Sequence, residues 1–145
     1  MPERTEGVLV LDTHVWLWMV EGVRGALGES AIEAIEDAGR RGAVRVSAIS
    51  VWEMAMLEAR GRITLSRPID EWVSAALRAR GIRLLPLRPD IAVASTRLPG
   101  TPHGDPSDRM LMASARISGG RLATCDQEIL AYSRSGHIAV LDARP

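Results

Sequence analysis

Short apolar runs and longer stretches with helical spacing alternate along this chain. The short runs are apolar at nearly every position, as in strands covered on both faces, and stand at residues 8–11, 43–47, 82–85, 121–124 and 138–141. The longer stretches place apolar residues three and four positions apart and predict helices at residues 13–20, 30–38, 50–60, 68–80, 89–97 and 106–118. A further short helix is expected before the last strand.

Strands that alternate with helices favour a parallel sheet, because each parallel pair needs a long crossover that a helix usually supplies. We therefore predict an α/β fold, a three-layer α/β/α sandwich with a mostly parallel central sheet. The chain has no repeat or linker, and its Pro- and Gly-rich loop at 98–106 is too short to separate two domains. Residues 1–145 are expected to form a single domain with its ligand site beyond the carboxyl ends of the strands.

Polar residues mark the expected starts of the helices. Thr13 is predicted to cap the first helix, and Ser30 with Glu33 has the spacing of a capping box for the second. Ser50 and Glu53 repeat this spacing at the third helix. A purely structural role in capping is therefore the alternative to any chemistry at Glu53.

The composition excludes several kinds of site. All 18 basic residues are Arg and none is Lys, so a P-loop and a Schiff-base enzyme lack their essential amine. A receiver domain is disfavoured for the same reason. Formal net charge is zero, which argues against nucleic-acid binding through bulk charge but leaves room for a local basic patch.

Cysteine and leader signals indicate the compartment. Cys125 is the only cysteine, so the chain forms no internal disulfide and no cysteine-based zinc site. The first apolar run is too short for a signal-peptide core or a membrane span. We expect a cytoplasmic protein without a membrane partner.

Four acidic residues stand where this fold places chemistry. Asp12 directly follows the first strand, and Asp126 follows the strand at 121–124. Parallel strands bring both carboxylates to one edge of the sheet. Glu53 and Asp108 lie near the starts of two helices, and Asp105 with Pro106 is a typical cap and first residue for the second of these.

Each acid alone is also typical of a helix cap, but the set points to metal chemistry. Carboxylates placed close together raise one another's pKa, and a divalent cation removes that repulsion. Hard carboxylate oxygens suit Mg²⁺ or Mn²⁺, which polarise a phosphodiester and generate an attacking hydroxide. The sequence therefore predicts a divalent-metal site built from Asp12, Glu53, Asp108 and Asp126, the candidate metal and catalytic residues.

Four motifs in order resemble the PIN-domain family over essentially the whole chain. The run VLVLDTHVWLW at 8–18 looks like the opening of a PIN domain, and ISVWEMA at 49–55 resembles its second acidic motif. The runs HGDPSDRMLMASA at 103–115 and LATCD at 122–126 are similar to the third and fourth. Within the family the chain looks most like the VapC toxins of type II toxin–antitoxin systems.

This resemblance implies an α/β/α sandwich and an endoribonuclease that cuts structured RNA such as tRNA or rRNA with Mg²⁺ or Mn²⁺. It also implies a homodimer and inhibition by a small VapB-like antitoxin. Asp12 and Asp108 match the direct metal ligands, with Glu53 and Asp126 completing the site directly or through water. Asp105 either shares the metal or caps its helix, and we favour the cap. The sequence leaves open whether one or two metals bind.

Several neighbours of the acids are candidates for supporting roles. Thr13 and Thr124 are expected to cap helices or, as the alternative, to hydrogen-bond a carboxylate. Arg109 and Arg116 are candidates for phosphate contacts, against a solvated face with a salt bridge. His14 and His103 are weaker candidates for contacts in the crevice.

The tryptophans divide between core and surface in this prediction. Trp16 and Trp52 are expected in the core, whereas Trp18 and Trp72 are expected at a dimer or antitoxin interface. Stacking on RNA bases is the alternative.

Other families fit less well. A phosphatase of the haloacid dehalogenase type needs a second Asp where His14 stands, and a dinucleotide-binding domain needs a glycine-rich turn after the first strand. Inside the PIN family, the alternatives are a housekeeping RNA-processing nuclease, a 5′-nuclease-like enzyme and a catalytically inactive binding module.

Overall fold

The sheet at the centre of the protein is entirely parallel. In this computed structural model, which describes residues 7–102 and 104–145, five strands lie in the order β3-β2-β1-β4-β5. They are β1 (Leu9–Leu11), β2 (Val44–Ser47), β3 (Ile82–Leu85), β4 (Arg121–Thr124) and β5 (Ala139–Asp142). Each of the four pairings is parallel, which confirms the predicted fold class. His103 lies outside the described residues.

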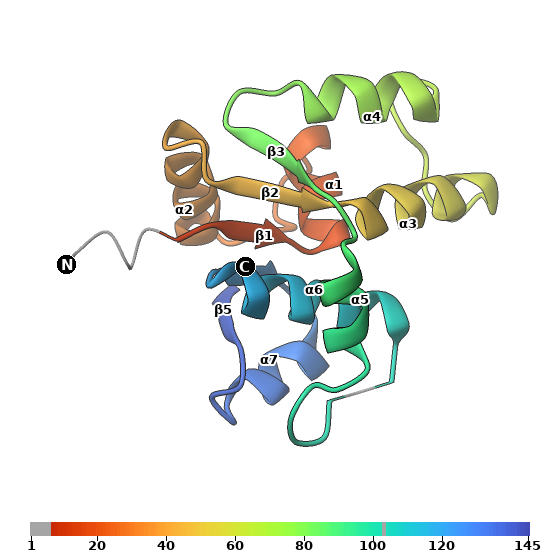
Figure 1. The fold of residues 1–145 in the computed structure, drawn as a ribbon. Coiled ribbons are helices and arrows are strands. Elements are labelled where there is room, and N and C mark those ends of the chain that lie inside the picture. The colour runs from red at the N-terminus through yellow and green to blue at the C-terminus, as the bar shows by residue number, and fades with distance from the viewer. Residues whose placement is uncertain (1–6, 103) are drawn as a thin grey trace.

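Seven helices of the described chain cover the two faces of this sheet (Figure 1). They are α1 (Thr13–Glu21), α2 (Glu29–Arg40), α3 (Ala48–Ala59), α4 (Ile69–Leu77), α5 (Pro89–Ser95), α6 (Pro106–Ser118) and α7 (Gln127–Ser133). None of them, within the described ranges, combines the length and apolar character needed to cross a membrane.

Alternation along β1 divides the core in two. Leu9 and Leu11 pack into a cluster with α1, α2, α4 and Met54 of α3, whereas Val10 packs with α5, α6 and α7. Successive side chains of a strand point to opposite faces, so each face of the sheet has its own helical layer. The three-layer sandwich predicted from the sequence is confirmed.

The strand order directs attention to the carboxyl end of β1. The chain runs from β1 through β2 to β3 on one side and then returns to place β4 on the other side of β1. Leu11 pairs with Ala123, and the backbone N–H of Asp12 donates to the carbonyl of Ala123 at 2.9 Å. Ligands of open α/β sheets bind where the strand order reverses in this way.

Three predicted helix starts are wrong. Asp12, rather than Thr13, caps α1, and Gly28 lies at the start of α2 in place of the Ser30 capping box. A Cβ at Gly28 would lie 2.5 Å from the Arg144 carbonyl oxygen, so the close approach of the C-terminal segment favours glycine at this helix start.

The third helix begins earlier than its capping-box spacing predicted. Ser47, the last residue of β2, caps α3 through the N–H of Ile49 at 3.1 Å. Strand and helix therefore join without a loop. Ser50 and Glu53 lie inside the helix and are not its capping box.

Candidate active site

Asp12 forms the centre of the site at the carboxyl end of β1. Its Oδ1 accepts the backbone N–H of Thr13 at 2.8 Å, and its Oδ2 accepts the hydroxyl of Thr124 at 2.6 Å. Burial raises the pKa of Asp12, and the hydrogen bonds from Thr124 and Thr13 partly oppose that rise. The charge of Asp126 raises this pKa further, so the acids that end β1 and β4 interact.

Glu53 reaches the same edge from α3. The hydroxyl of Thr13 donates to its Oε1 at 2.6 Å and also lies 2.9 Å from the hydroxyl of Ser50. Burial raises the pKa of Glu53, the Thr13 hydrogen bond lowers it, and the charges of Asp12 and Asp105 raise it. Glu53 is therefore a half-buried carboxylate held by a neighbouring helix.

Asp108 is the most strongly perturbed of these acids. It lies in the first turn of α6, and its pKa is raised to about 8, first by burial. The remaining causes are the charges of four other acids, which are Asp12, Asp105, Asp126 and Glu53. Asp108 and these four acids therefore lie close enough together to interact. The sequence predicted this proximity for Asp12, Glu53, Asp108 and Asp126.

Asp105 and Asp126 both cap helices. Asp105 Oδ1 accepts the N–H of Asp108 at 3.0 Å, so the cap that we favoured for Asp105 is confirmed. Asp126 Oδ1 accepts the N–H groups of Glu128 and Ile129 at 2.8 and 3.0 Å. These bonds use Oδ1 in both residues. The other carboxylate oxygen, Oδ2, could coordinate a metal ion.

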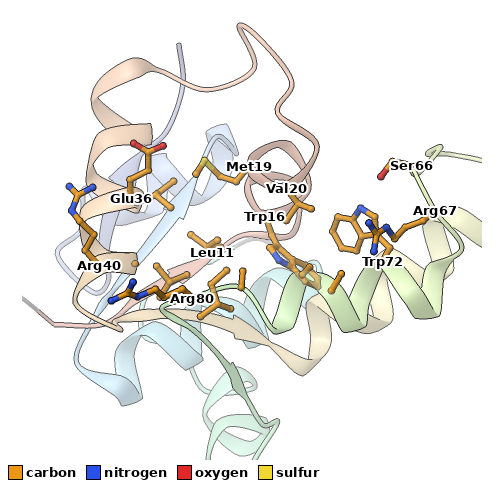
Figure 2. A pocket seen from close by; sticks show the side chains of 17 residues that line it. Leu11, Trp16, Met19, Val20, Glu36, Arg40, Ser66, Arg67, Trp72 and Arg80 are labelled. Atoms are coloured by element: carbon orange, nitrogen blue, oxygen red, sulfur yellow. The ribbon is translucent and has the colours of Figure 1, made fainter.

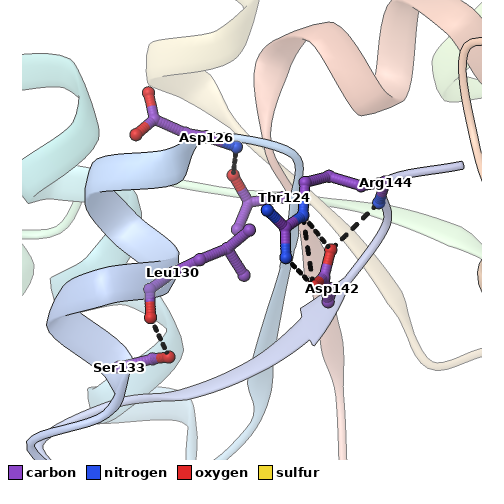
Figure 3. Close-up of polar contacts among 6 residues, drawn as sticks. All are labelled: Thr124, Asp126, Leu130, Ser133, Asp142 and Arg144. Carbon is purple, nitrogen blue, oxygen red and sulfur yellow. Dashed lines mark hydrogen bonds and ion pairs between the residues drawn. The ribbon is translucent and has the colours of Figure 1, made fainter.

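The threonines of the site hold carboxylates instead of capping helices. Thr13 donates to Glu53, and Thr124 donates to Asp12. Thr124 also accepts the N–H of Asp126 at 3.0 Å, as Figure 3 shows. Both hydroxyls are almost completely buried, which protects these bonds from competition with water. The alternative that we weighed for the threonines, a bond to a carboxylate, is confirmed.

The chemistry of the donor set fits a divalent cation. The oxygens are hard ligands. Burial is the main cause of the raised pKa of Asp108, and repulsion from the neighbouring acids, which a bound cation would relieve, raises it further. In the described part of the chain, no three His, Cys, Asp or Glu side chains are yet arranged as they would be around a bound ion.

The basic candidates lie at different distances from this cluster. Exposed His14 is close, because its charge lowers the pKa of both Asp12 and Glu53. Arg109 follows Asp108 on α6 and donates to the carbonyl of Pro102 at 3.5 Å. Arg116 lies nearer the other end of α6 and donates to the carbonyl of His137.

One of the tryptophan predictions is wrong and one is confirmed. Trp16 is fully buried as expected, but Trp52 is 55% exposed because α3 turns Ser50 and Met54 inward and Trp52 outward. Trp72 is 2% exposed, since α4 folds its indole against Trp16 with ring centroids 5.0 Å apart. Trp18 is half-buried beside His14.

Ser50 is a polar neighbour of the acids that the sequence prediction treated only as a cap. It is completely buried and bonded to Thr13. Ser50 stands three residues before Glu53. This spacing is typical of a capping box, and it also places two residues on the same face of a helix. The position of the helix start, which depends on Ser47, decides between them.

A second feature is a groove of about 920 Å³ that α1, α2 and α4 line together (Figure 2). Its floor is mostly apolar, with side chains that include Trp16, Met19, Val20, Ile35, Trp72 and Ala76. Exposed arginines and one acid complete its lining, namely Arg40, Arg67, Arg80 and Glu36. The groove therefore combines an apolar floor with an excess of positive charge.

Comparison with known proteins places this chain in a family. Residues 9–134 match the family described as PIN domain. Ribonuclease VapC22 of Mycobacterium tuberculosis (strain ATCC 25618 / H37Rv) is 33% identical over 133 residues, which cover 91% of this chain and 97% of that protein.

Solved structures share the fold at lower identity. The Rickettsia felis VapBC2 complex, bound to a DNA fragment from its promoter, contains a chain with a TM-score of 0.67 and 11% identity, covering 94% of this chain and 98% of that one. DNA-bound VapBC from Salmonella typhimurium gives a TM-score of 0.63 and 17% identity, with coverage of 93% and 97%. At these identities the likeness concerns the fold alone.

Proposed function

This chain belongs to the PIN-domain family of VapC-type ribonucleases, and we propose that it is a Mg²⁺- or Mn²⁺-dependent endoribonuclease toxin. The observation that carries the proposal is the convergence of Asp12, Glu53, Asp108 and Asp126, with Asp105, at one sheet edge. The substrate class proposed is structured RNA such as tRNA or rRNA. This class comes from the resemblance to VapC toxins.

Asp12 and Asp108 are the proposed direct metal ligands, and Glu53 and Asp126 complete the site directly or through water. A divalent ion held there would supply positive charge that polarises the phosphodiester and activates water for attack. Thr124 keeps Asp12 in place, and Thr13 does the same for Glu53. Arg109, beside Asp108 at the start of α6, is the proposed contact to an RNA phosphate.

We also propose a VapB-like antitoxin as the partner and the groove between α1, α2 and α4 as its docking place. Support comes from the structural relatives, which are toxin–antitoxin complexes. The apolar floor suits the apolar face of a peptide helix, and Arg40, Arg67 and Arg80 favour acidic residues beside that face. A cytoplasmic location is part of the same proposal.

A homodimer is the proposed oligomeric state. Large apolar side chains are exposed on α3, on β3, in the loop that leaves β3 and on α5, and they are Trp52, Leu84, Leu87 and Val93. β3 is an edge strand of the sheet, and exposed apolar side chains near an open strand edge are typical of an interface. Light scattering of wild type and Val93→Glu tests this, with a monomeric variant expected.

The experiment that tests the nuclease compares wild type with Asp12→Asn, which keeps the shape of the side chain and removes its charge. We expect growth arrest and discrete RNA cuts from the wild type only, with cleavage by purified protein abolished by EDTA. Loss of cleavage should exceed about 1,000-fold if the metal carries the chemistry. Asp37→Asn, on an exposed face of α2, is the matched control and should behave as wild type.

The same experiment separates the alternatives. Cleavage restricted to one precursor RNA, without growth arrest, would favour a housekeeping processing nuclease. Equal behaviour of wild type and Asp12→Asn, with no cleavage by either, would favour an inactive binding module.

A further inference from the structure

Three hydrogen-bonded side chains join α3 to the start of α1. The hydroxyl oxygens of Ser50 and Thr13 are 2.9 Å apart, and the Thr13 hydroxyl lies 2.6 Å from Glu53 Oε1. Ser50 is 0% exposed and Thr13 is 1% exposed. Water cannot easily replace either bond, so the connection is a permanent feature of the folded chain.

Proton counting gives this chain of bonds a direction. Each hydroxyl carries a single proton, and an ionised carboxylate only accepts. The proton of Thr13 is therefore used on Glu53, and Thr13 has only acceptor capacity left for Ser50. Ser50 must donate to Thr13, which in turn donates to Glu53.

Thr13 holds two carboxylates of the site at once. Its backbone N–H donates to Asp12 Oδ1 at 2.8 Å, while its hydroxyl donates to Glu53 Oε1 at 2.6 Å. The χ1 rotamer of Thr13 consequently sets the position of Glu53 relative to Asp12. Ser50 is the group that favours this rotamer, because only there does the Thr13 oxygen meet the Ser50 proton.

We propose that Ser50 is a positioning residue for Glu53 and acts through the hydroxyl of Thr13. The proposal rests on the proposed metal-dependent nuclease function of the carboxylate cluster. Ser50 touches neither substrate nor metal. Its effect is to hold Glu53 where the carboxylate can join Asp12 in binding a divalent cation.

Thr124 has a similar arrangement beside Asp12, except that the group donating to its hydroxyl is a backbone N–H. Thr124 donates to Asp12 Oδ2 and accepts the N–H of Asp126. Each buried threonine thus receives one bond and gives one to a carboxylate. On the α3 side the supporting donor is a side chain, so substitution can remove it without altering the backbone.

The first test measures Mn²⁺ binding by calorimetry and RNA cleavage by the same proteins. We expect Ser50→Ala to weaken Mn²⁺ binding about 10-fold and to lower kcat by a similar factor with KM unchanged. Ser114→Ala is the matched control, because Ser114 is equally buried but bonds only to the Met110 carbonyl of its own helix. An equal loss in Ser114→Ala would overturn the proposal, as would wild-type binding in Ser50→Ala.

A double-mutant cycle with Thr13→Val then tests the route of the effect. If Ser50 acts through Thr13, Ser50→Ala adds no further loss of Mn²⁺ affinity in the Thr13→Val background. Additive losses would overturn the proposal. If Ser50→Ala fails to fold, Ser50→Cys replaces it in the same cycle. Cysteine has a similar volume and a weak hydrogen-bond donor, so we expect a smaller loss of Mn²⁺ affinity.

The wild type separates the two levels of inference. Wild type that neither binds Mn²⁺ nor cleaves RNA would refute the proposed function, and the role of Ser50 with it. Wild type that binds and cleaves, beside an unaffected Ser50→Ala, would refute only the role of Ser50.

Discussion

The carboxylate edge and the apolar groove are built on opposite principles, although α1 contributes to both. The first turn of α1 supplies Thr13, and Asp12 caps it, whereas its later turns supply Trp16, Met19 and Val20 to the groove. At the edge, like charges repel, and buried hydroxyls hold them in place. In the groove, apolar packing is enough, as in the contact between Trp16 and Trp72.

On the proposed function, one helix would serve two ligands of different chemistry. Repulsion between the carboxylates makes the edge unfavourable without a cation, so the proposed metal site would lower the stability of that region in return for binding. The groove is already stable, and its affinity for a partner comes from apolar surface and the charge of its arginines. Changes in one region should therefore leave ligand binding in the other largely intact.

Outside the carboxylate edge, the largest expected effect concerns the groove. Val20 is 41% exposed and lines it, so Val20→Asp should place a charge under the apolar face of the antitoxin without disturbing the core. We expect a loss of antitoxin affinity of about 100-fold by calorimetry, with Mn²⁺ affinity unchanged. Ile117→Asp, an exposed site on α6, is the control and should bind the antitoxin like wild type. A loss of Mn²⁺ affinity in Val20→Asp would break the separation between the two regions.

The two regions also differ in what could be predicted from sequence. The strands, Asp12 and Asp126 were predictable, because an apolar run followed by an acid is a local signal. Asp105 and Pro106 likewise predicted the start of α6, which the structure has at Pro106. These features depend on residues that are close together in the chain.

Features that depend on distant segments were missed. Trp72 is buried because α4 folds onto α1, and Trp52 is exposed because no helix among the described residues covers that face of α3. The partner of Thr13 is Glu53, 40 residues away, whereas a helix cap is a local choice. Spacing alone does not distinguish these outcomes, since it holds no information on which element packs opposite.

A smaller effect is expected from the charge at the carboxylate edge. The pKa of Asp108 is about 8 in the folded chain, above its ordinary value of 3.8. The unfolded chain therefore releases this proton near pH 4 while the folded chain keeps it, so the free energy of unfolding falls as pH rises from 4 to 8 and then levels off. Allowing for partial exposure, we expect a loss on the order of 2 kcal/mol across this range in metal-free protein.

Chemical denaturation at several pH values, with and without Mn²⁺, measures this loss. Asp108→Asn should flatten the decline, and Mn²⁺ should stabilise wild type more at pH 8 than at pH 5. The same decline in Asp108→Asn as in wild type would assign the pH dependence to another group.

The smallest effect is expected where the groove is held together. Glu21, at the end of α1, accepts the indole N–H of Trp72 at 2.6 Å and the hydroxyl of Ser66 at 2.9 Å. The hydrogen bond from Trp72 lowers the pKa of Glu21 below its ordinary value of 4.5. The resulting stability is present above pH 4.5 and is lost as pH falls through the lowered value, which is opposite in sign to the contribution of Asp108.

Glu21→Gln keeps the shape and an acceptor oxygen but removes the charge. Because Glu21 is only half-buried, we expect it to lower the free energy of unfolding by only about 0.5–1 kcal/mol at pH 7, and by less as pH falls below 4.5. Antitoxin affinity should fall slightly, since Trp72 lines the groove, while Mn²⁺ affinity should stay the same. A pH-independent loss of stability would show that Glu21 contributes packing and not a charged hydrogen bond. The groove would then be stabilised by neutral packing alone, in clearer contrast to the carboxylate edge, where hydrogen bonds oppose charge repulsion.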